Sequence, residues 1–365
     1  TLIETGRVSK LLAFRGLERQ SIEQAEAGDI VALAGLTEAT VADTIAEISV
    51  TGALSARPID PSTLAMTFAI NDSPLAGQDG DKVTSRQIRD RLMREAEGNV
   101  AIRIVESAEK DAFEVAGRGE LQLAVLIEQM RREGYELSVS RPRVLFKENS
   151  ETGKREEPIE EVVVDVDEEY AGAVVSSISE RKGELQEMRP SGGGKQRLVF
   201  LAPARGLIGY HGLFLTETRG AGIMNRVFHS YAPHKGPIAA RRTGVLISME
   251  TGKAVPYALY NLEERGQMFI SPGSPVYQGM IIGENAKSGD LEVNPLKAKQ
   301  LTNFRASGKD DAVTLTTPID MTLEKALAYI ADDELVEVTP KAVRLRKRWL
   351  DPHERKRAAR RSAAE

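Results

Sequence analysis

The sequence predicts a multidomain α+β protein with a partial β-barrel, two split βαβ sandwiches, and a mostly β C-terminal domain that has a long loop and a basic tail. Three observations predict this class. Short strands open the chain, one β-α-β-β-α-β order occurs twice, and a long polar stretch interrupts the strands of the last third. At 365 residues the chain is also long for a single hydrophobic core, which favours several domains.

Residues 1–62 contain short strand-like segments and no helix-period pattern. The expected strands are 6–14, 21–25, 29–33 and 43–48. A β-barrel loses its open edges only when all its strands are present, and about sixty residues supply about half of one. We therefore expect a partial β-barrel here. Because the chain begins without Met, we also expect that the missing strands precede it in a longer protein.

The β-α-β-β-α-β order occurs first in residues 63–148 and again in residues 157–237, and it is the order of a ferredoxin-like sandwich. In each copy one helix has apolar residues at the i, i+3, i+4, i+7 spacing of a buried stripe. These residues are Leu123, Leu126, Ile127 and Met130 in the first copy and Ala171, Val174, Val175 and Ile178 in the second. An internal duplication supports the assignment more strongly than either copy alone.

Residues 238–365 return to strand-like patterns, with a helix expected over 322–330 and paired strands over 335–339 and 342–346. Residues 283–318 lack continuous apolar periodicity, and so long a connection is usually functional or disordered. This stretch carries cations for phosphates, amides for base edges and one aromatic ring for an unstacked base. The predicted RNA-binding residues are Lys287, Lys297, Lys299, Asn303, Phe304, Arg305 and Lys309. The alternative is a solvated surface loop, because loops are polar in general.

Charge is unevenly distributed along a chain whose net charge is −5. Residues 148–169 hold ten carboxylates and two basic residues, whereas residues 341–361 hold ten Lys and Arg and two acids. A basic tail on an acidic protein is typical of phosphate contact. We add four tail residues to the predicted RNA-binding set, namely Arg344, Arg346, Lys347 and Arg348.

No nucleotide site is predicted within these residues. The segment 191–195, SGGGK, has Arg189 where a Walker A loop needs its first Gly, and Gln196 where it needs Ser or Thr to reach Mg²⁺. A β-turn between two strands is the better interpretation. The guanine-binding and Mg²⁺-binding motifs of GTPases are absent from the sequence as well.

No catalytic residue and no metal site are predicted either. The sequence has no Cys, so it offers no disulfide and no thiolate nucleophile. His211, His229 and His234 lack the spacing of a helical metal-binding pair. No apolar run approaches the length of a membrane span and no export signal is present, so we expect a cytoplasmic protein without a membrane partner.

Several segments resemble those of known ribosome-binding proteins. Residues 26–31 (EAGDIV), 205–210 (RGLIGY) and 218–220 (TRG) resemble the translational GTPases. A more specific resemblance, to the C-terminal domain of the BipA/TypA family, lies in residues 300–312 (QLTNFRASGKDDA), 321–324 (MTLE) and 332–340 (DDELVEVTP). The resemblance covers essentially the whole chain.

The resemblance implies a domain order as well as a function. Residues 1–62, 63–148 and 157–237 would be similar to the second, third and fifth domains of elongation factor G, followed by a family-specific domain over 238–365. The family's N-terminal GTPase domain would be absent, and with it the GTP and Mg²⁺ that the full-length GTP hydrolase uses. We therefore expect no cofactor and no enzyme activity in these residues.

The partners implied by the resemblance are large-subunit rRNA, A-site tRNA and the small ribosomal subunit. The loop around residues 299–309 would reach toward the peptidyl-transferase centre and the tRNA acceptor end. Arg205, His211 and Arg219 would be further ribosome contacts. The implied role is large-subunit assembly together with stress and cold adaptation, and we expect a monomer.

Three other interpretations stay open. The chain could come from another ribosomal GTPase, such as an elongation factor 4-like or tetracycline-protection-like protein, although those should lack the 300–312 segment. It could be an enzyme with a metal held by the three histidines and Glu217. It could also be an interaction scaffold whose acidic residues 148–169 bind a basic partner.

Overall fold

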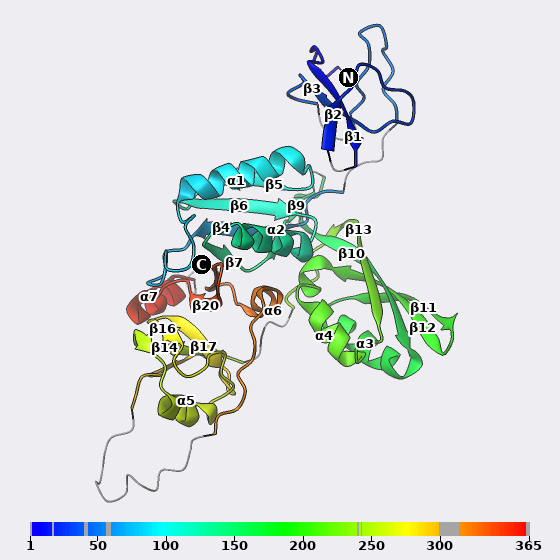
Figure 1. The fold of residues 1–365 in the computed structure, drawn as a ribbon. Coiled ribbons are helices and arrows are strands. Elements are labelled where there is room, and N and C mark those ends of the chain that lie inside the picture. Colours follow the sequence, from blue (N-terminus) through cyan, green and yellow to red (C-terminus); the bar gives the residue numbers. More distant parts are fainter. Residues whose placement is uncertain are drawn as a thin grey trace, which may run out of the picture. The chain divides into compact units, whose positions relative to one another are not determined.

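The structure is a computed structural model, and it describes residues 2–16, 18–39, 43–55, 60–149, 151–238, 241, 243–298 and 314–362. The chain divides into two compact units, Thr1–Asp60 and Pro61–Glu365, and each is described by itself (Figure 1). Both helices and sheets are present, so the predicted multidomain α+β class is confirmed. Among the described residues, no helix is long and apolar enough to cross a membrane.

The first unit contains one small antiparallel sheet. Its strands are β1 (Lys10–Arg15), β2 (Glu18–Ser21) and β3 (Val31–Ala34), in the order β2-β1-β3, and the described residues form no closed barrel. The strand expected at 21–25 lies earlier, at Glu18–Ser21, and the strand expected at 43–48 was wrong. Its apolar side chains Ile45 and Ile48 are exposed, so no buried face stabilises a strand there.

The first predicted sandwich has the expected element order. It consists of β4 (Leu64–Ile70), α1 (Ser85–Gly98), β5 (Arg103–Glu106), β6 (Ala112–Gly117), α2 (Glu120–Arg132) and β7 (Leu137–Ser140), and the strands lie in the order β7-β4-β6-β5. Thr84 begins α1 with a capping box, because its side chain and that of Gln87 each accept a hydrogen bond from the other's backbone N–H. The apolar stripe predicted for α2 is buried against the sheet, which confirms the periodicity argument.

The second predicted sandwich also has the expected order. It consists of β10 (Arg155–Asp167), α3 (Glu168–Glu180), β11 (Glu184–Gly192), β12 (Lys195–Pro203), α4 (Tyr210–Glu217) and β13 (Ile223–Pro233), with the strand order β11-β12-β10-β13. Gly193 and Gly194 connect β11 to β12 with φ values of +63° and +77°, so the turn predicted for SGGGK is confirmed. A 3₁₀ turn at Ala204–Gly206 and the left-handed Gly209 precede the helix α4.

The described residues of the last third form short strands and three helices. The strands are β14 (Val245–Ser248), β15 (Gly252–Lys253), β16 (Pro275–Val276), β17 (Met280–Glu284), β18 (Leu291–Val293), β19 (Glu334–Val338) and β20 (Val343–Lys347). The helices are α5 (Pro256–Glu263), α6 (Leu323–Tyr329) and α7 (Pro352–Ser362). Helix α5 was not predicted from the sequence, because its only local signal is Pro256 at its first turn. Residues 314–316, which follow the undescribed segment, form no strand.

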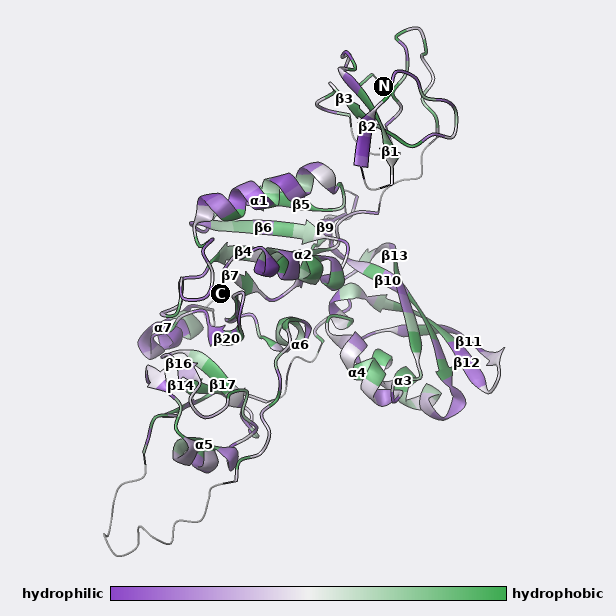
Figure 2. Ribbon diagram, in the orientation of Figure 1, coloured by the Kyte–Doolittle hydropathy of each residue, from purple (hydrophilic) through white to green (hydrophobic). Residues whose placement is uncertain are grey.

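Strands of the last third continue the sheet of the first sandwich. Strand β19 pairs antiparallel with β7, with Leu335 opposite Ser140, and this pairing joins segments nearly two hundred residues apart in the chain. The resulting sheet has the order β18-β14-β17-β20-β19-β7-β4-β6-β5, and β8 (Arg143–Val144) pairs with β4. One hydrophobic core lies along it and includes Leu123, Val139, Ile281 and Val336. In Figure 2, strands β6 and β17 are coloured as hydrophobic, whereas α1 and α7 are largely hydrophilic.

Candidate nucleic-acid interface

The long loop predicted to bind RNA is described only in part. Residues 299–313 lie outside the described residues, and with them Lys299, Asn303, Phe304, Arg305 and Lys309. The described part before this gap is not a plain loop, because it holds the end of β17 and the whole of β18, which pairs parallel with β14. Lys287 and Lys297 are exposed, and neither forms an ion pair with another described residue.

The basic run 341–361 divides into two parts with different surroundings. Its first part is strand β20, in which Arg344 is 12% exposed and Arg346 is 2% exposed. Arg344 donates to Glu337 Oε1 at 2.9 Å and to Asp79 Oδ2 at 3.1 Å. Arg346 donates to Asp72 and to Ser138 Oγ, the latter at 3.0 Å. These guanidinium groups therefore lie in the interior, where carboxylates from distant segments neutralise them.

Lys347 is also an internal cation. Its ammonium lies 2.6 Å from Asp290 Oδ2, 2.8 Å from Asp333 Oδ2 and 2.9 Å from Glu334 Oε1, and its side chain is 2% exposed. Burial alone would lower the pKa of Lys347, but the three carboxylates outweigh it and raise the pKa. Arg241 donates to both oxygens of Glu334, at 2.9 and 3.0 Å. Burial would raise the pKa of Glu334, but Arg241 and Lys347 together lower it.

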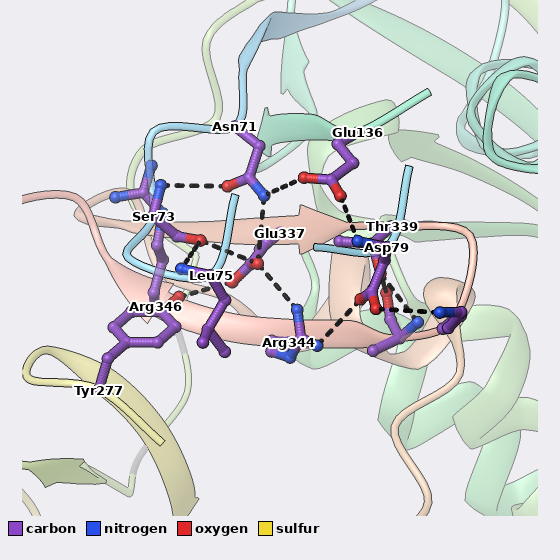
Figure 3. A network of polar contacts seen from close by, with 12 residues as sticks. Asn71, Ser73, Leu75, Asp79, Glu136, Tyr277, Glu337, Thr339, Arg344 and Arg346 are labelled. Carbon is purple, nitrogen blue, oxygen red and sulfur yellow. Dashed lines mark hydrogen bonds and ion pairs between the residues drawn. The ribbon is translucent and has the colours of Figure 1, made fainter. Parts of the chain in front are cut away.

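Arg344 and Arg346 of β20 belong to a polar network that joins the first sandwich to the C-terminal strands (Figure 3). Its centre is the fully buried carboxylate of Glu337 on β19. This carboxylate accepts from Ser73 Oγ at 2.9 Å, from Asn71 Nδ2 at 3.2 Å and from Tyr277 Oη at 2.7 Å, besides Arg344. A buried charge that is fully hydrogen-bonded in this way fixes the packing of the segments around it.

These contacts correct the expectation for the basic tail. Arg344, Arg346 and Lys347 hold the fold together, so we leave them out of the candidate RNA-binding residues. Arg348, at the end of β20, is 37% exposed and pairs with Glu109 on the surface. A long-range burial of this kind leaves no trace in a charge pattern, so the sequence alone does not distinguish the buried cations of β20 from exposed ones.

The second part of the basic run is helix α7, and its cations face solvent. Lys356, Arg357, Arg360 and Arg361 are exposed, and within the described ranges none of them pairs with a carboxylate. Their spacing of one, three and four residues places them on one face of the helix. These residues belong to the basic run 341–361 but not to the four tail residues predicted to bind RNA. Their helical spacing is the sequence signal that could have identified them.

Contacts on the other side of α7 fix its position. Arg355 donates to Glu292 Oε1 on β18 at 3.0 Å, and to the backbone oxygens of Trp349 and Leu350 at 2.9 and 2.6 Å. Asp351 caps the helix, because its Oδ1 accepts from the N–H groups of His353 and Glu354. A rigid helix with four unpaired cations on one face is suited to bind a polyanion such as the RNA backbone.

The three ribosome contacts expected in the second sandwich have different surroundings. Arg205 is mostly buried, pairs with the fully buried Glu157, and also donates to the backbone oxygen of Gly236. His211, on α4, and Arg219, just after α4, are exposed. Only these two are free to contact a partner. Among the described residues, no group of His, Asp or Glu could hold a metal ion.

Comparisons with known proteins agree on the type of protein that the chain resembles. A family model described as "TypA/BipA C-terminal domain" matches residues 243–352, and one described as "Elongation factor G C-terminus" matches residues 154–242. Proteins named "Large ribosomal subunit assembly factor BipA" are 50% identical to this chain in Haemophilus influenzae, over 97% of the chain, and in Synechocystis, over 94%.

The chain spans 58% of the length of these relatives. A crystal structure from Thermus thermophilus aligns with a TM-score of 0.34 at 15% identity, covering 63% of this chain and 50% of the other. That likeness is too low to support any conclusion about the fold.

Proposed function

Because this chain belongs to the TypA/BipA family, we propose that it is the ribosome-binding portion of a translational GTPase that acts in assembly of the large ribosomal subunit. Two findings support the proposal. The relatives that are 50% identical over nearly the whole chain are named as assembly factors of this subunit. Helix α7 presents four exposed cations that have no described carboxylate partner, as a protein that binds rRNA requires.

In this proposal the surface that contacts RNA consists of α7 and the neighbouring loop. The α7 residues are Lys356, Arg357, Arg360 and Arg361, and Arg348, Lys287 and Lys297 are further exposed cations. From the segment outside the described residues, we retain Lys299, Asn303, Phe304, Arg305 and Lys309 as proposed contacts to A-site tRNA and the peptidyl-transferase centre. His211 and Arg219 would contact the ribosome from the second sandwich.

The domains would have separate tasks. We propose that residues 1–62, 63–148 and 157–237 correspond to the second, third and fifth domains of elongation factor G, and that 238–365 is the family-specific domain. The two sandwiches would hold the C-terminal domain at a fixed distance from the rest of the protein. GTP and Mg²⁺ would act in a separate domain, and these residues would bind RNA without catalysis. The protein would be a cytoplasmic monomer that also binds the small subunit and contributes to cold and stress adaptation.

Co-sedimentation with 70S ribosomes and with isolated large subunits over a series of salt concentrations tests the proposal. We compare the parent chain with a variant in which Lys356, Arg357, Arg360 and Arg361 are all changed to Ala. The matched control changes four exposed cations on α1, on β5 and just before β10 to Ala, namely Arg86, Arg94, Arg103 and Lys154. This control loses the same amount of charge.

The α7 variant should bind more weakly than the control. Each phosphate contact contributes about 0.7–0.9 to the slope of log affinity against log salt, so four contacts contribute about 3. The slope should fall by about this amount in the α7 variant and should change little in the control. Equal binding by both variants would exclude α7 from the interface. No binding by the parent chain at low salt would exclude ribosome binding by these residues.

A further inference from the structure

Trp349 is the only tryptophan in the sequence, and its side chain is exposed at the surface. Tryptophan is usually buried over most of its area, but this one is 38% exposed. Since a whole tryptophan side chain covers about 250 Å², about 95 Å² of it remains accessible. That area is enough for one flat aromatic partner.

The surroundings of Trp349 hold the indole in place. The residue lies between the end of β20 and the start of α7, and its backbone oxygen accepts from Arg355 Nη1 at 2.9 Å. Arg355 is itself fixed by Glu292. The guanidinium of Arg348 lies over the indole, 5.7 Å from the ring centroid, and Arg348 is paired with Glu109. Because the ring is held before a partner arrives, little entropy is lost when something stacks on it.

Cations on both sides of Trp349 in the sequence, with Arg348 over its ring and the α7 residues after it, indicate the chemistry of that partner. The exposed cations of α7 begin seven residues after the tryptophan, at Lys356, and continue to Arg361. An exposed aromatic ring next to cations is the combination with which proteins bind single-stranded nucleic acid, since the ring stacks on a base and the cations bind phosphates. A duplex would satisfy the cations, but its paired and stacked bases offer no free face to the indole.

We propose that Trp349 stacks on an unpaired base of a single-stranded RNA segment whose phosphates contact Lys356, Arg357, Arg360 and Arg361. This inference rests on the proposed RNA binding and adds the class of RNA, which is unpaired rather than duplex. It also adds a binding residue outside the long loop. A protein partner for the exposed indole is the competing explanation, and the experiment below separates the two.

The single tryptophan makes stacking directly measurable, because all tryptophan emission of the chain comes from residue 349. The parent chain is titrated with a twelve-nucleotide single-stranded RNA, and separately with a blunt duplex that contains the same strand, at equal phosphate concentration. Tryptophan emission reports stacking, and the anisotropy of a label on the RNA reports binding. The single strand should quench the emission to saturation, whereas the duplex should bind without quenching.

Three variants complete the test. Trp349→Ala should bind the single strand about 5- to 100-fold more weakly, as expected for one lost stacking contact, and should bind the duplex as the parent does. Trp349→Phe should retain part of the affinity for the single strand, because phenylalanine also stacks. Lys356→Ala combined with Arg360→Ala should weaken binding of both RNAs. Circular dichroism and thermal unfolding establish that each variant is folded.

Two results would overturn the inference. One is that the two RNAs quench the emission of the parent chain equally, or that neither quenches it. If neither RNA quenches the emission, a protein partner is left as the explanation for the exposed indole. The other is unchanged affinity of Trp349→Ala for the single strand. Failure of the proposed function gives a different result, because the parent chain would then not co-sediment with ribosomes. That result does not depend on whether the single-stranded RNA quenches the tryptophan emission.

Discussion

Replacing Glu136 with glutamine removes a buried negative charge that organises the loop between β4 and α1. The carboxylate is fully buried and accepts four hydrogen bonds. Its Oε1 accepts from the N–H groups of Gly80 and Asp79, at 2.7 and 3.0 Å. Its Oε2 accepts from Gly77 N–H at 2.8 Å and from Asn71 Nδ2 at 3.0 Å. This carboxylate, which forms no ion pair with a cation of the described residues, thus accepts from four donors of one loop.

The size of the effect follows from counting these donors. In Glu136→Gln the amide oxygen keeps two donors, and the amide NH₂ faces the other two. A hydrogen bond to a charged group contributes about 1.5–3 kcal/mol, so the loss of two should weaken the loop by about 3 kcal/mol or more. Since 1.4 kcal/mol is a factor of ten, the loop should open about a hundredfold more often.

Amide hydrogen exchange of residues 71–82 measures this opening. Exchange at Gly77, Asp79 and Gly80 should be about a hundredfold faster in the variant at neutral pH. Glu161→Gln is the matched control, because Glu161 is an exposed glutamate on β10, and it should leave exchange in this loop unchanged. Equal exchange in the two variants would refute the argument that the Glu136 carboxylate organises the loop.

The same site predicts a dependence on pH. Burial would raise the pKa of Glu136, but the N–H groups of Gly77, Gly80 and Asp79 and the Asn71 amide hold it below its ordinary value of 4.5. A carboxylate with a lowered pKa in the folded state stabilises above its unfolded pKa, and the stabilisation is lost as the pH falls through the folded value. The difference between parent and Glu136→Gln should therefore be full at pH 7 and should shrink below pH 4.5. A difference that grew on acidification would contradict this assignment.

Three further substitutions test other contacts. Lys347→Met removes the ammonium shared by three carboxylates and should lower the free energy of unfolding in urea by about 3 kcal/mol. The control Lys341→Met, at an exposed site, should change this free energy by less than about 0.5 kcal/mol. Because the folded pKa of Lys347 is raised, its contribution should be present below pH 10.5 and lost as the pH rises through the folded value. Tyr277→Phe removes the 2.7 Å hydrogen bond to the buried Glu337 and should lower the free energy of unfolding in urea by about 1–3 kcal/mol. The control Tyr260→Phe, at an exposed tyrosine, should leave this free energy unchanged. Gly209→Ala places a Cβ 2.6 Å from that of Ala328 at a φ of +71°, so it should lower the thermal midpoint. The control Gly212→Ala, in open space on α4, should leave the midpoint unchanged or raise it. Equal midpoints in the two variants would contradict the close approach of Gly209 to α6.

Part of the candidate site was already visible in the sequence. The sequence predicts that Lys287 and Lys297 bind RNA, and the structure places both at the surface. The excess of cations in residues 341–361 was also found, but its exposed members are on α7 rather than in β20. Which of these cations are exposed depends on carboxylates such as Asp79 and Asp290, which only the folded chain brings next to β20.

The sequence by itself determined the two β-α-β-β-α-β modules and the glycine turn between β11 and β12. Helical stripes and turn residues are properties of consecutive residues, so a local pattern is sufficient to predict them. Only the tertiary structure decided that β19 pairs with β7, and that Arg346 and Lys347 are buried while Arg357 and Arg360 are exposed. The free energy of a charged side chain depends on which distant groups surround it, and those neighbours exist only after the chain has folded.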